Sequence, residues 1–317
     1  MIHSNPMPHA PLHGLTKPDS GMVYMICAML LLPVGDTFAK LLTDTMSPVG
    51  VTMWRMLAQA AFLLPLALFL RHRLQGAMFS PVVALSGALL VVSLTSLIGA
   101  FSVMPIATAI AIFFVEPLIL TVLAGLLLAE RAGPRRLIAV GVGLIGAMIV
   151  IRPGFSTYGW ATVLPLISAF AYALNMIVLK KASQTRTTLT MQCGTTIYAA
   201  GILVGIAVLL QVMGFDGLIV QATDFKTWSL IACAGAVAAT SFLLVGEAYR
   251  HSDATALAPF QYFEIITATA LGFLIFGDFP DTLTWIGVAI ILGSGIYIFH
   301  REGQADTSAP RRKRGAH

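Results

Sequence analysis

The sequence predicts an all-α membrane protein with ten transmembrane helices, arranged as two inverted five-helix repeats. Three observations lead to this prediction. The composition is strongly apolar, ten apolar segments are long enough to cross a bilayer, and the two halves share a repeat in which two carboxylates fall in register.

The composition excludes a soluble protein. Of the 317 residues, 57% are hydrophobic and 10% are charged, and the mean hydropathy is +0.87. Soluble domains carry roughly 25% charged residues, because water has to cover their surface. Cys27, Cys193 and Cys233 lie in apolar segments without paired spacing, so we expect small buried side chains rather than a disulfide or metal site. We expect no cofactor.

A spanning helix needs about 20 mostly apolar residues. Charged and Pro/Gly-marked breaks divide the chain into ten such segments. The predicted spans are 22–42, 49–70, 80–102, 106–129, 135–151, 160–181, 188–211, 227–249, 254–277 and 282–300. The first repeat is then 22–152 and the second 160–300, with an N-terminal tail at 1–21 and a basic tail at 301–317. The start of the chain is polar and rich in Pro and His, so we expect a tail there rather than a cleaved signal.

The distribution of Lys and Arg predicts the orientation. Ten spans place both termini on one side, where fifteen Lys and Arg residues fall, against three on the other side. Cytoplasmic loops carry such an excess. We therefore expect a multi-pass protein of the bacterial inner (plasma) membrane with both termini in the cytoplasm. The run Arg311–Arg314 is interpreted as a positive flank, and no nucleic acid is expected as a partner.

The internal repeat appears when the sequence is shifted by 148 residues. Glu116 then aligns with Glu264, and Glu130 with Asp278, in a chain with only 14 acidic residues. Five spans per half force the second half to enter the membrane upside down. The loop charges agree, since 130–136 carries three arginines and 278–282 carries no cation. Inverted repeats around a midplane site are typical of secondary transporters.

Two segments resemble the closing parts of EamA repeats, which places the chain near the drug/metabolite transporter superfamily. They are FFVEPLILTVLAGLLLAERAGPRRLIAVGVGLIGAMIVIRPG at Phe113–Gly154 and APFQYFEIITATALGFLIFGDFPDTLTWIGVAIILGSGIYIFHRE at Ala258–Glu302. The resemblance covers roughly residues 22–300. It implies a ten-helix basket around a central cavity, and export of amino acids and other metabolites or import of compounds such as riboflavin or S-adenosylmethionine. The second half departs from the pattern. It has Asp278 where Glu is common, and it does not end in Arg-Pro-Gly as the first half does.

Charged residues inside the first two spans are the first candidate site. A charge at the bilayer centre costs about 2.5–3.5 kcal/mol or more, so it usually faces a cavity or a partner. Asp36 and Lys40 lie one turn apart, in a sense that favours an ion pair, and Arg55 lies at a similar depth. These charges form either a substrate or proton site open to the periplasm, or a staple in which Arg55 neutralises Asp36 while Lys40 extends outward.

Glu116 and Glu264 fall near the midplane of the fourth and ninth spans. Because desolvation disfavours the anion, such carboxyl groups are suited to take up and release protons near neutral pH. Pro117 removes a backbone hydrogen bond and frees a carbonyl one turn earlier. Gln261 and Tyr262 lie beside Glu264 and complete this candidate group. The alternative is that the glutamates only hydrogen-bond neighbouring helices.

Polar and aromatic residues of other spans are further candidates. Asn175, with Tyr172 one turn earlier, lies in the sixth span at the depth that Asp36 has in the first. It either contacts substrate or makes an interhelical hydrogen bond. Trp54 is a weaker candidate, as are Gln59 and Tyr198. Small residues fill the fifth and tenth spans and predict close helix packing, with a homodimer seam as the alternative: Gly141, Gly143, Gly146, Ala147, Gly287, Gly293, Ser294 and Gly295.

Together these features predict a secondary transporter for a small polar metabolite, an amino acid or a related compound, with export coupled to a proton gradient. The alternative is an uptake carrier for a vitamin or a nucleoside-like metabolite of the riboflavin or S-adenosylmethionine type. A membrane scaffold fits the midplane charges less well. An intramembrane enzyme is disfavoured because the sequence has neither HExxH nor GxSxG. The expected partners are the substrate, protons and the lipid bilayer, with the chain as a monomer or homodimer.

Overall fold

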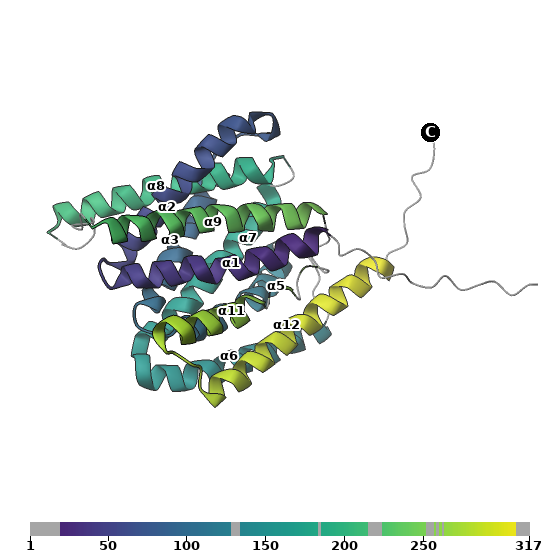
Figure 1. Ribbon diagram of the computed structural model, residues 1–317. Helices are drawn as coiled ribbons and strands as arrows, with labels where there is room; N and C mark the ends of the chain where they lie inside the picture. Colours follow the sequence, from purple (N-terminus) through teal and green to yellow (C-terminus); the bar gives the residue numbers. More distant parts are fainter. Residues whose placement is uncertain are drawn as a thin grey trace, which may run out of the picture.

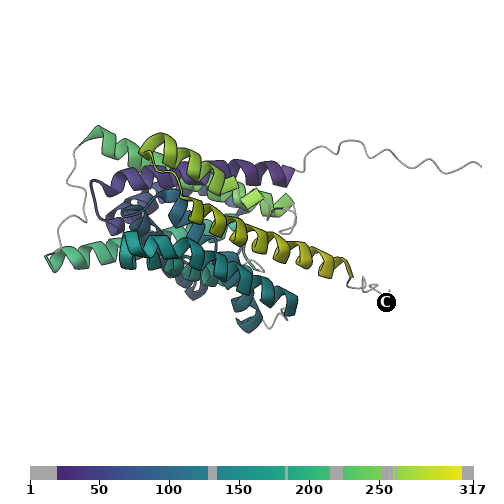
Figure 2. The ribbon, with the colours of Figure 1, turned by 90° about the horizontal axis from the view of Figure 1, so that it is seen from below.

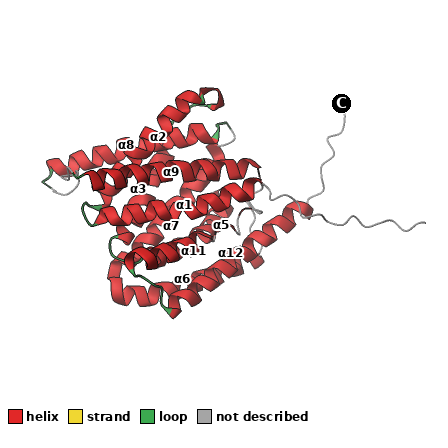
Figure 3. Cartoon of the chain, viewed as in Figure 1, coloured by secondary structure: helices red, strands yellow, loops and turns green. Residues whose placement is uncertain are grey.

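The computed structural model describes residues 20–127, 134–182, 185–214, 224–251, 257, 260–261 and 263–308. Across these ranges all regular structure is helical and no strand occurs (Figure 3). The prediction of an all-α protein is therefore confirmed. Tyr262 and the two ends of the chain, 1–19 and 309–317, lie outside the described residues.

The helices overlap the predicted segments, but α6 and α12 extend beyond the predicted ends at 151 and 300, so α12 continues into the predicted tail. Their bounds are α1 Ser20–Thr43, α2 Pro48–Phe69, α3 Pro81–Phe101, α4 Ile106–Phe113, α5 Glu116–Leu127, α6 Pro134–Tyr158, α7 Leu164–Ala182, α8 Thr188–Val212, α9 Phe225–His251, α11 Phe263–Leu271 and α12 Thr282–Ser308. Short 3-10 turns occupy Arg71–Arg73 and Gly159–Val163, and a π-helical turn, η3, follows α11 at Gly272–Phe276.

Serine followed by proline starts two of these helices. Ser47 precedes Pro48 at the start of α2, and its side chain accepts a hydrogen bond from the backbone N–H of Gly50. Ser80 precedes Pro81 at the start of α3 in the same way. A serine N-cap satisfies a free backbone donor, and proline at the first helical position gives up a donor that had no partner.

Seven helical segments are long and apolar enough to cross a membrane. They are Ser20–Thr43, Pro48–Phe69, Pro81–Phe101, Ile106–Leu127, Gly159–Ala182, Thr188–Val212 and Phe225–Ala248. Three shorter apolar segments, Ile138–Ile151, Phe263–Phe276 and Thr282–Ser294, coincide with the predicted fifth, ninth and tenth spans. The chain is therefore a multi-pass membrane protein, while ten crossings in two inverted repeats stay a prediction.

The fourth predicted span is not one continuous helix. The helix is interrupted by a turn at Phe114 and Val115, between α4 and α5. Pro117 lacks the backbone N–H that a continuous helix needs there. The break places Glu116 at the first position of α5.

Most helix pairs in the bundle combine one helix from the first half of the sequence with one from the second half. α1 packs along α9, and α3 packs along α7; α1 meets α11, and α7 meets α5. α2 packs on α9 and α3 on α8, while α6 lies along α12. The start of α1 and the end of α12 lie at the same end of the bundle (Figures 1 and 2).

α6 and α12 pack through glycine, as the small residues of these spans predicted. A Cβ atom added at Gly287 would lie 2.7 Å from the backbone oxygen of Gly146, and one added at Gly146 would lie 2.8 Å from Ile290. Gly141 and Gly293 differ, since an added Cβ atom would meet nothing within 4 Å at either position. The close contact continues to Gly143, where an added Cβ atom would lie 2.8 Å from the Ser294 hydroxyl oxygen.

The cysteines correct one expectation. Cys193 is buried, whereas Cys27 and Cys233 are exposed on the surface of the chain, and all three are free thiols. An apolar segment of a membrane protein faces lipid on one side, so apolar sequence does not imply burial within the protein.

Candidate functional site

An ion pair enclosed between α1 and α2 forms the first part of the site. Arg55 Nη1 lies 3.1 Å from Asp36 Oδ1, and the two residues are 2% and 5% exposed. Gly35 allows α9 and the Arg55 side chain to lie close to α1, because a Cβ atom at this position would lie 3.2 Å from Val237 of α9 and 3.8 Å from Arg55 Nη2. Arg55 Nε is buried and has no hydrogen-bond partner within the described residues. The pair thus leaves one strong donor unused.

Lys40 does not pair with Asp36, which corrects the expected ion pair along α1. Its ammonium group lies 3.0 Å from Asp278 Oδ2 and donates to the backbone oxygen of Met104 at 3.2 Å. It also lies 4.6 Å from the ring centroid of Phe276. Asp36 faces α2 and is occupied by Arg55, so Lys40, one turn nearer the helix end, reaches the loop after η3. Sequence analysis missed Asp278 as its partner.

Tyr158 lies near this second ion pair, at the end of α6 and beyond the apolar segment Ile138–Ile151. Its partial burial raises the pKa of the phenol, and the nearby carboxylates of Asp278 and Asp281 raise it further. The phenol of Tyr158 therefore stays neutral over a wider pH range than that of an ordinary tyrosine, and it can act as a hydrogen-bonding group.

The two midplane glutamates occupy equivalent places in the two halves. Glu116 is the first residue of α5, and Glu264 is the second residue of α11. Glu116 Oε1 is buried without a hydrogen-bond partner in the described structure. Glu264 lies within electrostatic range of both Asp36 and Glu116. We call Asp36, Arg55, Glu116 and Glu264 the central charged cluster.

This cluster has more acid than base. It contains three carboxyl groups and one guanidinium group, and Arg55 is committed to Asp36. Uncompensated charge is costly in a low-dielectric interior. The cluster can therefore hold protons, or accept hydrogen bonds or positive charge from a ligand.

Asn175 makes interhelical hydrogen bonds. Its Oδ1 accepts a hydrogen bond of 2.6 Å from Ser86 of α3, and the Ser86 hydroxyl lies 3.1 Å from that of Thr195 in α8. Asn175 is 2% exposed. These bonds correspond to the second of its two predicted roles and join α3, α7 and α8.

Aromatic side chains lie between the helices of the two halves. Trp54 meets Trp228 edge to face, with ring centroids 4.9 Å apart. Phe113 meets Tyr172 in a similar arrangement at 5.6 Å. Trp54 Nε1 is buried without a partner, so it is a free donor in the described structure. Gln261 is half-buried and interacts with another group of the protein.

Further buried polar atoms accompany these residues, most of them on side chains that sequence reasoning did not single out. Within the described ranges, Gln59 donates to Thr196 at 3.1 Å, but its Oε1 accepts nothing. The hydroxyl groups of Thr95, Ser241 and Thr269 also lack partners. Gln59 was the only one of these residues that its sequence position singled out, because serine and threonine hydroxyls occur throughout apolar helices.

Comparison with known proteins identifies the family. The model of the EamA-like transporter family matches residues 19–152 and again 159–299. The chain belongs to this family. Membership confirms the resemblance seen in the sequence and implies a transport role for a small molecule rather than catalysis.

Two kinds of named relative are similar to this EamA-family chain. A riboflavin transporter of Vibrio cholerae is 31% identical over 63% of this chain and 63% of its own length. An S-adenosylmethionine uptake transporter of Rickettsia prowazekii is 24% identical over 91% of this chain and 95% of its own length. The match to the riboflavin transporter therefore leaves more than a third of that protein uncovered.

A solved structure shares the fold. It is described only as the crystal structure of a protein, and it aligns with a TM-score of 0.63 at 15% identity. The alignment covers 92% of this chain and 100% of the other. At this identity the likeness concerns the fold alone.

Proposed function

We propose that this protein is a secondary transporter of the inner membrane that takes up a small metabolite containing a nitrogen heteroaromatic ring. The observation that carries the proposal is the central charged cluster, which lies enclosed between helices of both halves of an EamA-family chain. The name of the S-adenosylmethionine uptake transporter favours uptake, and neither relative's name favours the amino-acid export that the sequence suggested.

The substrate class follows from what the two named compounds share. Riboflavin and S-adenosylmethionine each combine a nitrogen-containing aromatic ring with a hydroxylated five-carbon unit. The protein offers aromatic faces at Trp54 and Tyr172, and free polar atoms at Trp54 Nε1, Arg55 Nε and Glu116 Oε1. Aromatic faces stack on flat rings, and unpaired polar groups discriminate strongly for a ligand that satisfies them.

Alternating access is supported by the exchange of helix pairs. The main contacts between the halves have counterparts with the halves swapped, as in α1 with α9 and α3 with α7. α6 and α12 also begin 148 residues apart, at Pro134 and Thr282, which is the offset of the sequence repeat. Two inverted halves around one site can rock and open it to either side in turn. In this arrangement both termini lie on one side, and the excess of Lys and Arg on that side favours the cytoplasm.

The proposed energy source is the proton gradient, through Glu264 and Glu116. We expect Glu264→Gln to abolish the dependence of transport on external pH, because an amide holds the site permanently neutral. The control is Glu247→Gln near the end of α9, where the side chain is 36% exposed. Uptake into proteoliposomes, measured from about pH 5.5 to about pH 8, where a perturbed carboxyl group can titrate, checks this prediction. Unchanged pH dependence in Glu264→Gln would remove this residue from the coupling mechanism.

The experiment that tests the function is uptake of radiolabelled riboflavin and radiolabelled S-adenosylmethionine by proteoliposomes of the purified protein. We expect saturable uptake of one of them, lost in Arg55→Ala and retained in Glu247→Gln. Competition by adenosine, flavin and free amino acids then identifies the recognised part of the molecule. Competition by amino acids alone would contradict the heteroaromatic class, and efflux without uptake would contradict the direction.

A further inference from the structure

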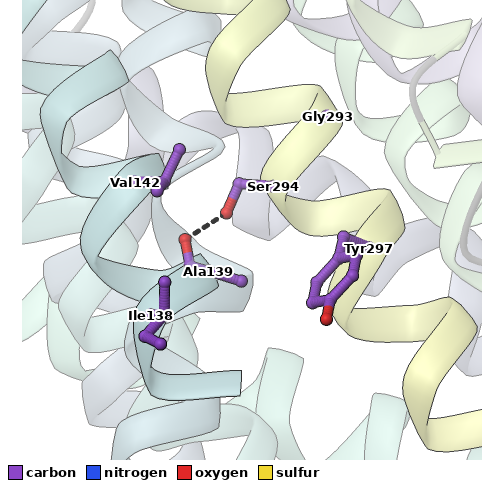
Figure 4. Close-up of a pocket in the computed structure, with 6 residues that line it drawn as sticks. All are labelled: Ile138, Ala139, Val142, Gly293, Ser294 and Tyr297. Atoms are coloured by element: carbon purple, nitrogen blue, oxygen red, sulfur yellow. Dashed lines mark hydrogen bonds between the residues drawn. The ribbon is translucent and has the colours of Figure 1, made fainter. Parts of the chain in front are cut away.

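A groove opens between α6 and α12, away from the central charged cluster. It has a volume of about 440 Å³ and is lined by Ile138, Ala139, Val142, Gly293, Ser294 and Tyr297 (Figure 4). The two helices touch at Gly146 and Gly287, and the groove lies beside the Ser294 end of their contact. The Ser294 hydroxyl donates to the backbone oxygen of Ala139, so the polar groups at the centre of the groove satisfy each other.

The groove faces outward. Ile138 is 66% exposed, Val142 45% and Tyr297 42%. An outward face of a membrane-spanning helix is covered by lipid, and the groove has apolar walls suited to a hydrocarbon chain. Tyrosine is enriched where a membrane-spanning segment reaches the headgroup level. Tyr297 therefore indicates that the groove runs from the interface into the hydrocarbon.

Basic residues occupy helix positions beyond the Tyr297 end of the groove. α6 and α12 are antiparallel, since Ala139 meets Ser294 while Val150 meets Gly287. Arg135 and Arg136 occupy the first turn of α6, and Arg301 follows Tyr297 by about one turn of α12. All three positions are thus at the same end of the pair. Within the described parts of α6 and α12, Glu302 is the one acidic residue next to these positions, which leaves a positive excess.

We infer that the groove between α6 and α12 binds one acyl chain of an anionic phospholipid, whose headgroup phosphate lies at the level of Arg135, Arg136 and Arg301. Basic residues between membrane helices on the cytoplasmic side attract anionic headgroups. The apolar walls select for a lipid, and the positive excess selects for its charge. This site is separate from the transport site, so the inference does not depend on the proposed substrate.

The test fills the groove without disturbing the helix pair. An added Cβ atom meets nothing within 4 Å at Gly293, so Gly293→Leu places a side chain in the groove. Gly141→Leu is the matched control, because Gly141 is equally open but does not line the groove. Native mass spectrometry of the full chain, offered phosphatidylglycerol and phosphatidylcholine in equal amounts, reports the bound lipid.

We expect the wild type and Gly141→Leu to retain phosphatidylglycerol and Gly293→Leu to lose it. If Gly293→Leu does not fold, Ile138→Trp blocks the exposed mouth instead. Arg135→Gln and Arg136→Gln are each expected to reduce the preference for phosphatidylglycerol about fivefold. Retention of this lipid by both groove variants overturns the inference. So does a wild-type dimer that carries no lipid and dissociates in Gly293→Leu, which would assign the groove to a second copy of the chain.

Discussion

Arg55 is the largest side chain that the described protein encloses completely, and its partner Asp36 is almost as well shielded. Burying two charges costs more than their attraction returns unless the geometry is good, and removing one of them leaves the other unpaired. The pair is therefore weak as a stabilising device, and we expect it to act in binding or switching. The free Nε of Arg55 agrees with that role.

Substitution of one partner is expected to cost more than substitution of both. Arg55→Ala leaves the carboxylate of Asp36 buried and unpaired, at a cost of about 3–5 kcal/mol. The double variant Asp36→Asn/Arg55→Gln keeps a neutral hydrogen-bonding pair and should lose less than the sum of the single variants. Thermal unfolding in detergent and transport together measure the cycle. Additive losses would show that the two side chains do not act as a pair.

At the scale of elements, the α6–α12 pair depends on the absence of side chains at its centre. Gly287→Ala would place a Cβ atom 2.7 Å from the backbone oxygen of Gly146 and against Val150. We expect a loss of about 1–3 kcal/mol, because overpacking a tight contact forces the backbones apart. Gly141→Ala, in open space on α6, should leave the melting temperature unchanged or raise it. Equal melting temperatures for both variants would contradict glycine-mediated packing.

A second set of elements meets at Lys40. Its ammonium group joins α1, the link between α3 and α4, and the loop after η3, through Asp278, Met104 and Phe276. The π-helical turn ends at Gly277, whose φ of +72° favours glycine and turns the chain toward Asp278. This contact connects the two halves of the sequence at the end of the bundle opposite the start of α1.

We expect Asp278→Lys to slow transport, since two ammonium groups would then face each other at the connection. The exchange variant Lys40→Asp/Asp278→Lys restores opposite charges and should recover most of the rate. Initial uptake rates at low and high salt measure both effects, and salt should weaken the repulsion in the single variant. If the exchange variant transports no faster than Asp278→Lys, the ion pair between residues 40 and 278 does not set the transport rate.

At the scale of the whole molecule, both ends of the chain are expected to lie in the cytoplasm. α1 begins and α12 ends at the same end of the bundle, which fits an even number of crossings. The sequence predicts that fifteen of the Lys and Arg residues lie on this side of the membrane. A reporter active only in the periplasm should be inactive when fused to the C-terminus and active when inserted at Asp44, between α1 and α2. Activity of the C-terminal fusion would reverse the proposed topology.

The sequence by itself determined where apolar helices lie and which residues correspond between the halves. The offset of 148 residues that aligned Glu116 with Glu264 also relates the starts of α6 and α12. Segment length and charge distribution carry this information, because a helix must cross about 30 Å of hydrocarbon whatever it packs against. Family membership followed from the same segments.

Only the tertiary structure decided which polar groups meet. It paired Lys40 with Asp278 rather than Asp36, and Asn175 with Ser86. It also opened the groove beside Tyr297. In a bilayer both the lipid-facing and the protein-facing sides of a helix are apolar, so the sequence does not reveal which way a helix turns. The partners of its few polar residues are fixed only when the helices pack.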